Sequence, residues 1–171
     1  SCYAPYAPSR LIVQRLLPLL EEHSIQTALE LGPGWGNYTL DLAGSCRCVT
    51  CVDISSDVLD FITRIGHDNG YDNIFTINAK WESFEPERMY DLVFGYNCFY
   101  RLPDLSSCIE KMTRSASKLC VMGMSTGIEP PWVFDMEREM DIPVHWDNKD
   151  YIYFVNILYS MGIDPELYII P

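Results

Sequence analysis

The chain has 171 residues, a length that predicts one domain with a sizeable hydrophobic core. Its 24 acidic and 12 basic residues give a formal net charge of −12, and the absence of any Lys/Arg run argues against nucleic acids and anionic membranes as partners. The seven cysteines form an odd set, and neither end has a long apolar run. We therefore expect a reducing, cytoplasmic compartment.

Residues 1–23 predict an irregular arm followed by a helix. The arm is rich in Tyr, Pro and Ala, and Tyr3 and Tyr6 could either fold over a cofactor or attach the arm to the body of the domain. Ser9 is a suitable N-cap for a helix with apolar residues at helical spacing. Pro18 is expected to kink that helix or end its regular hydrogen bonding early.

A short apolar strand at 28–31 leads into a turn with three alternate glycines, Gly32, Gly34 and Gly36. Glycine lets the backbone approach a ligand closely because no Cβ intervenes. The dinucleotide-binding fingerprint requires a glycine where this chain has Asn37. Glu30, just before the turn, would oppose a pyrophosphate but suits a cationic ligand such as S-adenosylmethionine. The turn therefore favours that cofactor over a nicotinamide dinucleotide.

A helix at 37–43 and a strand at 48–52 are expected next, and the strand ends at Asp53. The Asp53 carboxylate can accept hydrogen bonds from the two hydroxyls of a ribose, which either cofactor would supply. Ser55 or Ser56 then opens a helix with one apolar stripe. The cysteines around this strand could suggest a metal site, but we favour small buried hydrophobic residues: Cys46, Cys48 and Cys51.

Together with Asp53, the string from Leu29 to Gly36 resembles the class I S-adenosylmethionine-dependent methyltransferases, whose first motif is E-x-G-x-G-x-G. The resemblance extends over most of the chain. It implies an α/β, Rossmann-like, doubly wound and mostly parallel sheet with helices on both faces, in one domain over residues 1–171. It also implies cofactor contacts along the ends of four strands, from Glu30, Gly32, Pro33, Gly34, Trp35, Gly36, Asp53, Ile54, Ala79, Lys80, Trp81, Asn97 and Cys98.

The third strand, expected at 74–77, leads to the segment that reaches the adenine in this family. By the resemblance, Ala79 lies near the exocyclic amine, and Lys80 and Trp81 form walls around the base. An exposed Trp81 would offer stacking to a purine. The alternative is a structural ring that packs in the core or on the surface.

The fourth strand, expected at 91–95, is a continuous apolar run typical of a central parallel strand. The residues after it lack the Asn/Asp-Pro-Pro-aromatic tetrad of many amino-methylating relatives, which argues against adenine and glutamine amides as acceptors. Clustered carboxylates of the catechol-type enzymes are also missing, so no metal is expected. A helix beginning at Pro103-Asp104 has Lys111 and Arg114 towards its end, and a fifth strand follows at 119–122.

Residues 125–148 are too long for an ordinary loop and predict a substrate-side insert or lid that contains Trp132 and Trp146. The alternative is a flap over a sheet edge. A last helix and a sixth strand at 167–170 complete the expected elements, and a seventh strand cannot be placed.

Methyl transfer needs chiefly the alignment of the acceptor with the activated methyl group, so no catalytic residue is obligatory. If a base exists, Tyr100 and His145 are the candidates, within a wider set of Tyr96, Asp135 and Glu137. The expected function is methyl transfer from S-adenosylmethionine to a small apolar or cationic acceptor. A non-catalytic cofactor-binding or regulatory subunit and a nicotinamide oxidoreductase are the alternatives.

Overall fold

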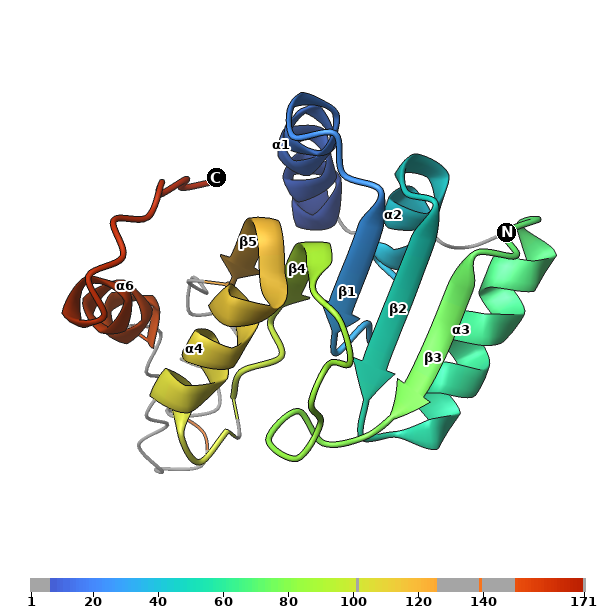
Figure 1. Ribbon diagram of the computed structural model, residues 1–171. Coiled ribbons are helices and arrows are strands. Elements are labelled where there is room, and N and C mark those ends of the chain that lie inside the picture. Colours follow the sequence, from blue (N-terminus) through green and yellow to red (C-terminus); the bar gives the residue numbers. More distant parts are fainter. Residues whose placement is uncertain (1–6, 101, 126–138, 140–149, 171) are drawn as a thin grey trace. The chain divides into compact units, whose positions relative to one another are not determined.

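The computed structural model describes residues 7–100, 102–125, 139 and 150–170 (Figure 1). It divides into two compact units, 1–123 with 168–171, and 124–167. The arm before residue 7 lies outside the described residues, as does almost all of the predicted insert. Whether 1–171 acts as a single domain stays a prediction.

The first unit is built on a five-stranded parallel sheet in the order β3-β2-β1-β4-β5 (Figure 1). The register is continuous through its centre, where Leu29 of β1 pairs with Thr50 on one side and Val93 on the other. This α/β architecture confirms the expected Rossmann-like fold. The strands are β1 Thr27–Leu31, β2 Cys48–Asp53, β3 Ile74–Asn78, β4 Tyr90–Tyr96 and β5 Ala116–Gly123.

Helices cover both faces of this sheet. On one face, Leu42 and Ile62 share a buried cluster with Phe94 of β4, which brings α1 (Ala7–Glu22), α2 (Thr39–Ser45) and α3 (Ser56–Asp68) together. Alternate side chains of a strand point to opposite faces, so the neighbours of Phe94 face the other way. On that other face, the place of a Cβ at Gly95 lies 3.3 Å from Met112 Cε of α4 (Leu105–Ser115).

The caps of α3 and α4 are those predicted. Ser55 accepts a hydrogen bond from the Val58 N–H, and Asp104 accepts one from the Ser107 N–H. α1 begins at Ala7, two residues before the N-cap expected at Ser9, and it does not end early at Pro18 but continues to Glu22. Leu16 and Leu20 are buried on either side of that proline, and their packing stabilises the helix across the missing backbone donor.

The second unit contains α6 (Asp150–Ser160), whose Phe154 and Leu158 are buried. Gly162 follows it with a φ of 74°, as a glycine that ends a helix commonly has. The sixth strand predicted at 167–170 is wrong, because the backbone from 163 to 170 is irregular. Among the described residues, no helix combines the length and apolarity needed to cross a membrane.

Candidate functional site

The glycine turn lies at the carboxyl end of β1, where the strand order reverses between β2 and β4. In open α/β sheets, ligands bind at such a switch point. Gly32, Gly34 and Gly36 have φ values of 59°, 53° and 74°, a conformation that favours glycine. The turn is held by hydrogen bonds from the Gly32 N–H to Val52 O and from the Gly36 N–H to Pro33 O, both 2.9 Å.

The surroundings of the three glycines differ. A Cβ at Gly32 would lie 2.6 Å from Cys98 Cβ, and one at Gly36 would lie 2.5 Å from Ile65 Cδ1. A Cβ at Gly34 would meet nothing within 4 Å. The first and third glycines therefore permit close packing against the protein, while the second borders open space that a ligand can occupy.

Glu30, in β1 just before the turn, is buried, with 1% of its surface exposed. Its Oε2 accepts hydrogen bonds from Thr39 Oγ1 at 2.7 Å and from Cys51 Sγ at 3.5 Å, whereas Oε1 has no partner among the described residues. Burial raises the pKa of Glu30 to about 7, although the two hydrogen bonds oppose that rise. The free oxygen is thus a buried acceptor beside the turn, suited to a hydrogen-bond donor or a cation.

Asp53 lies at the carboxyl end of β2, and its Oδ1 accepts a 2.8 Å hydrogen bond from the Ser55 N–H. Its carbonyl accepts from the Ala79 N–H at 3.0 Å and from Asn78 Nδ2 at 3.1 Å. The structure therefore brings together the residue predicted for the ribose and the segment predicted for the adenine. Ile54, which follows Asp53 in the chain, is 64% exposed.

Trp81 is not the exposed ring expected of an adenine wall. Only 7% of its surface is exposed, and its Nε1 donates to Cys108 O of α4 at 3.4 Å. This burial favours the structural interpretation of the ring. Lys80 is exposed beside it, and Trp35 in the glycine turn is 65% exposed, edge-to-face with Phe61 at 5.3 Å.

The end of β4 forms the other side of the site. Asn97 has a φ of 52° and donates its N–H to Gly123 O at 2.9 Å, which ties the end of β4 to the end of β5. Burial raises the pKa of the Cys98 thiol to about 12, so the thiol is neutral at physiological pH. Tyr100 is 59% exposed, and His145 lies outside the described residues, as do Asp135, Glu137 and both insert tryptophans.

Sequence reasoning missed two residues of this site, Thr39 and Tyr38. Thr39 opens α2 and donates to Glu30, while Tyr38 packs between Phe94 and Tyr96 at centroid distances of 5.1 and 5.3 Å. A hydroxyl residue in the first helical turn after a glycine turn was the available signal for Thr39. Within the part of the chain that is described, no group of three or more His, Cys, Asp or Glu side chains could hold a metal ion.

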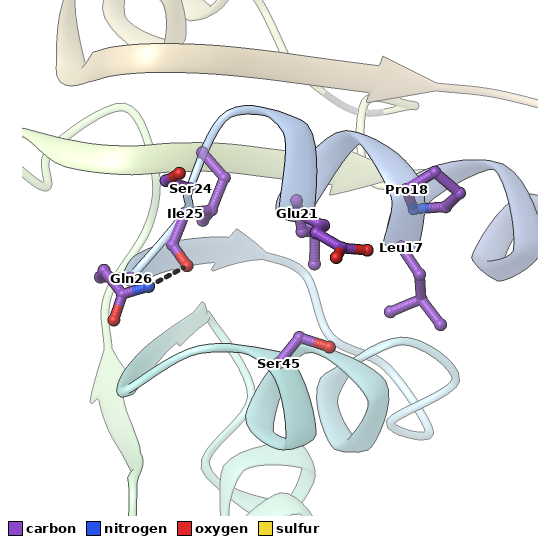
Figure 2. A pocket seen from close by; sticks show the side chains of 8 residues that line it. Leu17, Pro18, Glu21, Ser24, Ile25, Gln26 and Ser45 are labelled. Carbon is purple, nitrogen blue, oxygen red and sulfur yellow. Dashed lines mark hydrogen bonds between the residues drawn. The ribbon is translucent and has the colours of Figure 1, made fainter.

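A hollow of about 540 Å³ lies at the opposite end of β1 from the glycine turn. Figure 2 shows side chains of α1, of residues 24–26 that precede β1, and of Ser45 around it. It is lined mainly by residues that precede β1, so it is separate from the site at the carboxyl ends of the strands.

Comparisons with known proteins agree with this geometry. A family model described as a methyltransferase domain matches residues 28–118, just over half of the chain. An uncharacterized protein of Haemophilus influenzae is 26% identical over 157 residues, which cover 90% of this chain and 57% of that protein. The chain thus spans little more than half the length of this relative.

Solved structures share the fold. A Methanococcus maripaludis protein assigned to the S-adenosylmethionine-dependent methyltransferases aligns with a TM-score of 0.69 at 18% identity, over 98% of this chain and 83% of that one. The N-methyltransferase NodS of Bradyrhizobium japonicum WM9 aligns with a TM-score of 0.63 at 19% identity, over 90% and 82% of the two chains. Coclaurine N-methyltransferase, bound to N-methylheliamine and S-adenosylhomocysteine, aligns with a TM-score of 0.53 at 26% identity, over 63% and 34%.

Proposed function

The chain belongs to the class I S-adenosylmethionine-dependent methyltransferases, and from this membership we propose that it transfers the methyl group of S-adenosylmethionine to a small-molecule acceptor. The proposal chiefly depends on the buried Oε1 of Glu30, two residues before the glycine turn, which has no hydrogen-bond partner among the described residues, and on the open space at Gly34. A cationic cofactor would satisfy the charge and occupy the space. The same membership leaves no support for the nicotinamide alternative.

The residues present fit S-adenosylmethionine. The backbone of the turn from Gly32 to Gly36 can lie along the methionine part of the cofactor, with the Glu30 carboxylate beneath it. Asp53 is proposed to accept the ribose hydroxyls, and Ala79 and Lys80 to border the adenine. When bound, the cofactor supplies a methyl group that its sulfonium already activates. The further contacts we propose are Pro33, Trp35, Ile54, Asn97 and Cys98.

A small, apolar or cationic acceptor is supported by charge and by one relative. The net charge of −12 disfavours polyanions and favours positively charged molecules near the surface. Coclaurine N-methyltransferase, at 26% identity, is bound to the small amine derivative N-methylheliamine. We propose that the insert at 125–148, with Trp132 and Trp146, lines the acceptor side, and that Tyr100 or His145 accepts a proton where the acceptor must lose one.

Calorimetry with S-adenosylhomocysteine and NAD tests the cofactor, and a screen of small amines, phenols and thiols for methyl transfer tests the activity. We expect saturable binding of S-adenosylhomocysteine, poor competition by NAD and turnover of at least one acceptor. Trp146→Ala should lower acceptor turnover without changing cofactor affinity. Cofactor binding without any turnover would instead support a regulatory subunit.

A further inference from the structure

Lys111 of α4 is buried although lysine is rarely buried unless it is paired, and only 8% of its surface is exposed. The sequence predicted only that Lys111 lies towards the end of the helix, where its charge complements the helix dipole. Instead, its side chain reaches away from α4 to the turn that follows β3. This turn contains the residues proposed to border the adenine.

The Lys111 ammonium donates to three main-chain carbonyls of that turn. Nζ lies 2.9 Å from Trp81 O, 3.0 Å from Glu82 O and 2.9 Å from Phe84 O. An ammonium group has three N–H donors, which here are shared among these three carbonyls and the nearby Glu85 carboxylate. The Glu85 carboxylate lies 3.1 Å away and adds an ion pair, and the side-chain hydrogen bond from Lys111 lowers the pKa of Glu85.

The turn behaves as a single helical turn that Lys111 closes. The N–H groups of Ser83 and Phe84 both donate to Lys80 O, at 3.1 and 2.9 Å, which leaves the later carbonyls without partners inside the turn. A cation at the carboxyl end of a helical turn satisfies such carbonyls and its dipole. A second hydrogen bond connects the turn to α4 in the opposite direction: Trp81 Nε1 donates to Cys108 O of α4.

The other end of the same segment is attached to β2. Asn78 Nδ2 donates to Ile54 O at 2.9 Å, and the Ala79 N–H donates to Asp53 O at 3.0 Å. Ala79 and Lys80 thus lie between two attachments, one at β2 and one at Lys111. Their main chain cannot shift without breaking one of them.

We propose that Lys111 is a positioning residue that fixes the main chain of residues 79–84 and thereby sets the selectivity of the site for adenine. This inference rests on the proposed function, because it assigns the adenine to this segment. Lys111 itself is not proposed to contact the cofactor. Without its ammonium, the turn would lose the partner of three carbonyls and the base would meet a mobile wall.

The test compares two ligands that differ only in the base, S-adenosylhomocysteine and S-inosylhomocysteine, in which hypoxanthine replaces adenine. Wild-type protein should prefer the adenine ligand by more than about tenfold, because an ordered edge discriminates a donor from an acceptor. Lys111→Met keeps the aliphatic stem and should weaken binding of S-adenosylhomocysteine by about tenfold and reduce the preference to about threefold or less. Lys111→Arg, which retains the charge, should lie between the two.

Arg114→Met is the matched control. Arg114 lies on the same helix and contacts the same Glu85 carboxylate at 2.9 Å, but its described contacts do not include the carbonyls of the turn. Its affinities for both ligands should stay within about twofold of wild type, as expected for an exposed ion pair. If Lys111→Met left the ratio of the two affinities unchanged, whether or not both affinities fell, the proposal would be overturned.

Amide hydrogen exchange on cofactor-free protein separates this inference from the proposed function. Residues 80–84 should exchange faster in Lys111→Met than in wild type, while the amides of β4 stay protected. Unchanged exchange at 80–84 would overturn the positioning role whatever the ligand data show. If wild type bound neither ligand, both the proposed function and the role of Lys111 in adenine selectivity would be refuted. The exchange rates would still show whether Lys111 holds the turn in place.

Discussion

The hydroxyl of Thr39 donates a 2.7 Å hydrogen bond to Oε2 of Glu30, across the interface between α2 and β1. This bond partly compensates for the burial of a carboxylate whose two hydrogen-bond donors among the described residues, Thr39 and Cys51, are uncharged. Burial outweighs these hydrogen bonds and raises the pKa of Glu30 from its ordinary value of 4.5 to about 7, so the group is partly protonated near neutral pH.

Glu30→Gln should therefore change how stability depends on pH in the cofactor-free protein. A raised pKa means that the folded state is favoured fully below the unfolded value of about 4.5, and that this contribution is lost as pH rises through about 7. The loss is about 3 kcal/mol for a shift of this size. Urea unfolding at pH 5 and pH 8 should show wild type losing about that much relative to Glu30→Gln. Parallel pH profiles would contradict the assignment.

Asp53→Ala should weaken cofactor binding by about 2 kcal/mol or more, as expected for the loss of charge-assisted hydrogen bonds in a partly buried site. The fold should stay intact, because the backbone pairing of β2 with β3 does not need this side chain. Asp57→Ala, in the first turn of α3, is the control for a lost carboxylate near the site. Calorimetry with S-adenosylhomocysteine gives the comparison, and equal affinities for wild type and Asp53→Ala would show that Asp53 serves only the entry to α3.

Gly34→Ala and Gly36→Ala should separate ligand contact from packing. Both place alanine at a positive φ, which costs about 1 kcal/mol. Gly36→Ala also drives its Cβ into Ile65, and the overlap should cost about 2 kcal/mol more in the free energy of unfolding. Gly34→Ala fills open space and should lower cofactor affinity by more than about tenfold at a smaller loss of stability. Thermal unfolding and calorimetry on both variants decide the matter, and the reverse pattern would refute it.

Asp91→Ala should destabilise the amino-terminal edge of the sheet without affecting the cofactor site. Asp91 Oδ2 accepts from the N–H groups of Gln26 and Thr27 at 2.8 and 3.2 Å, and Lys118 Nζ lies 3.3 Å from Oδ1. Partial burial would raise the pKa of Asp91, but these donors outweigh it and the pKa is lowered.

The Asp91 carboxylate therefore stabilises the fold above its unfolded pKa, and the contribution disappears as pH falls through the folded pKa. Removing it should cost about 2 kcal/mol at pH 7, because two backbone donors lose their partner. The exposed Asp72→Ala is the control. A difference between the two variants that persisted at strongly acidic pH would argue against an ionised carboxylate.

Local sequence signals made most of the strands and the N-caps of two helices predictable. The apolar runs gave β1, β2 and β4, and the side chains of Ser55 and Asp104 marked the beginnings of α3 and α4. Each of these depends on neighbours in sequence, which is why sequence alone was enough. The strand expected at 167–170 is not formed, because this short apolar run pairs with no strand of the described sheet.

The parts of the site that could not be predicted depend on contacts between distant segments. Trp81 is buried because α4 offers a carbonyl to its indole, and Lys111 is buried because the turn after β3 offers it three. Neither contact leaves a periodicity in the sequence. The raised pKa of Glu30 similarly follows from its depth below the turn. Residue type alone would place all three side chains wrongly.

The conformation of the glycine turn is fixed by protein contacts, with Gly32 packed against Cys98 and Gly36 against Ile65. The difference this makes is kinetic. A ligand that meets a preformed turn need not wait for a loop to find its conformation, so encounters should convert to complexes in a single observable phase. Differences in affinity among cofactor analogues should then appear in their residence times, while their rates of capture stay alike.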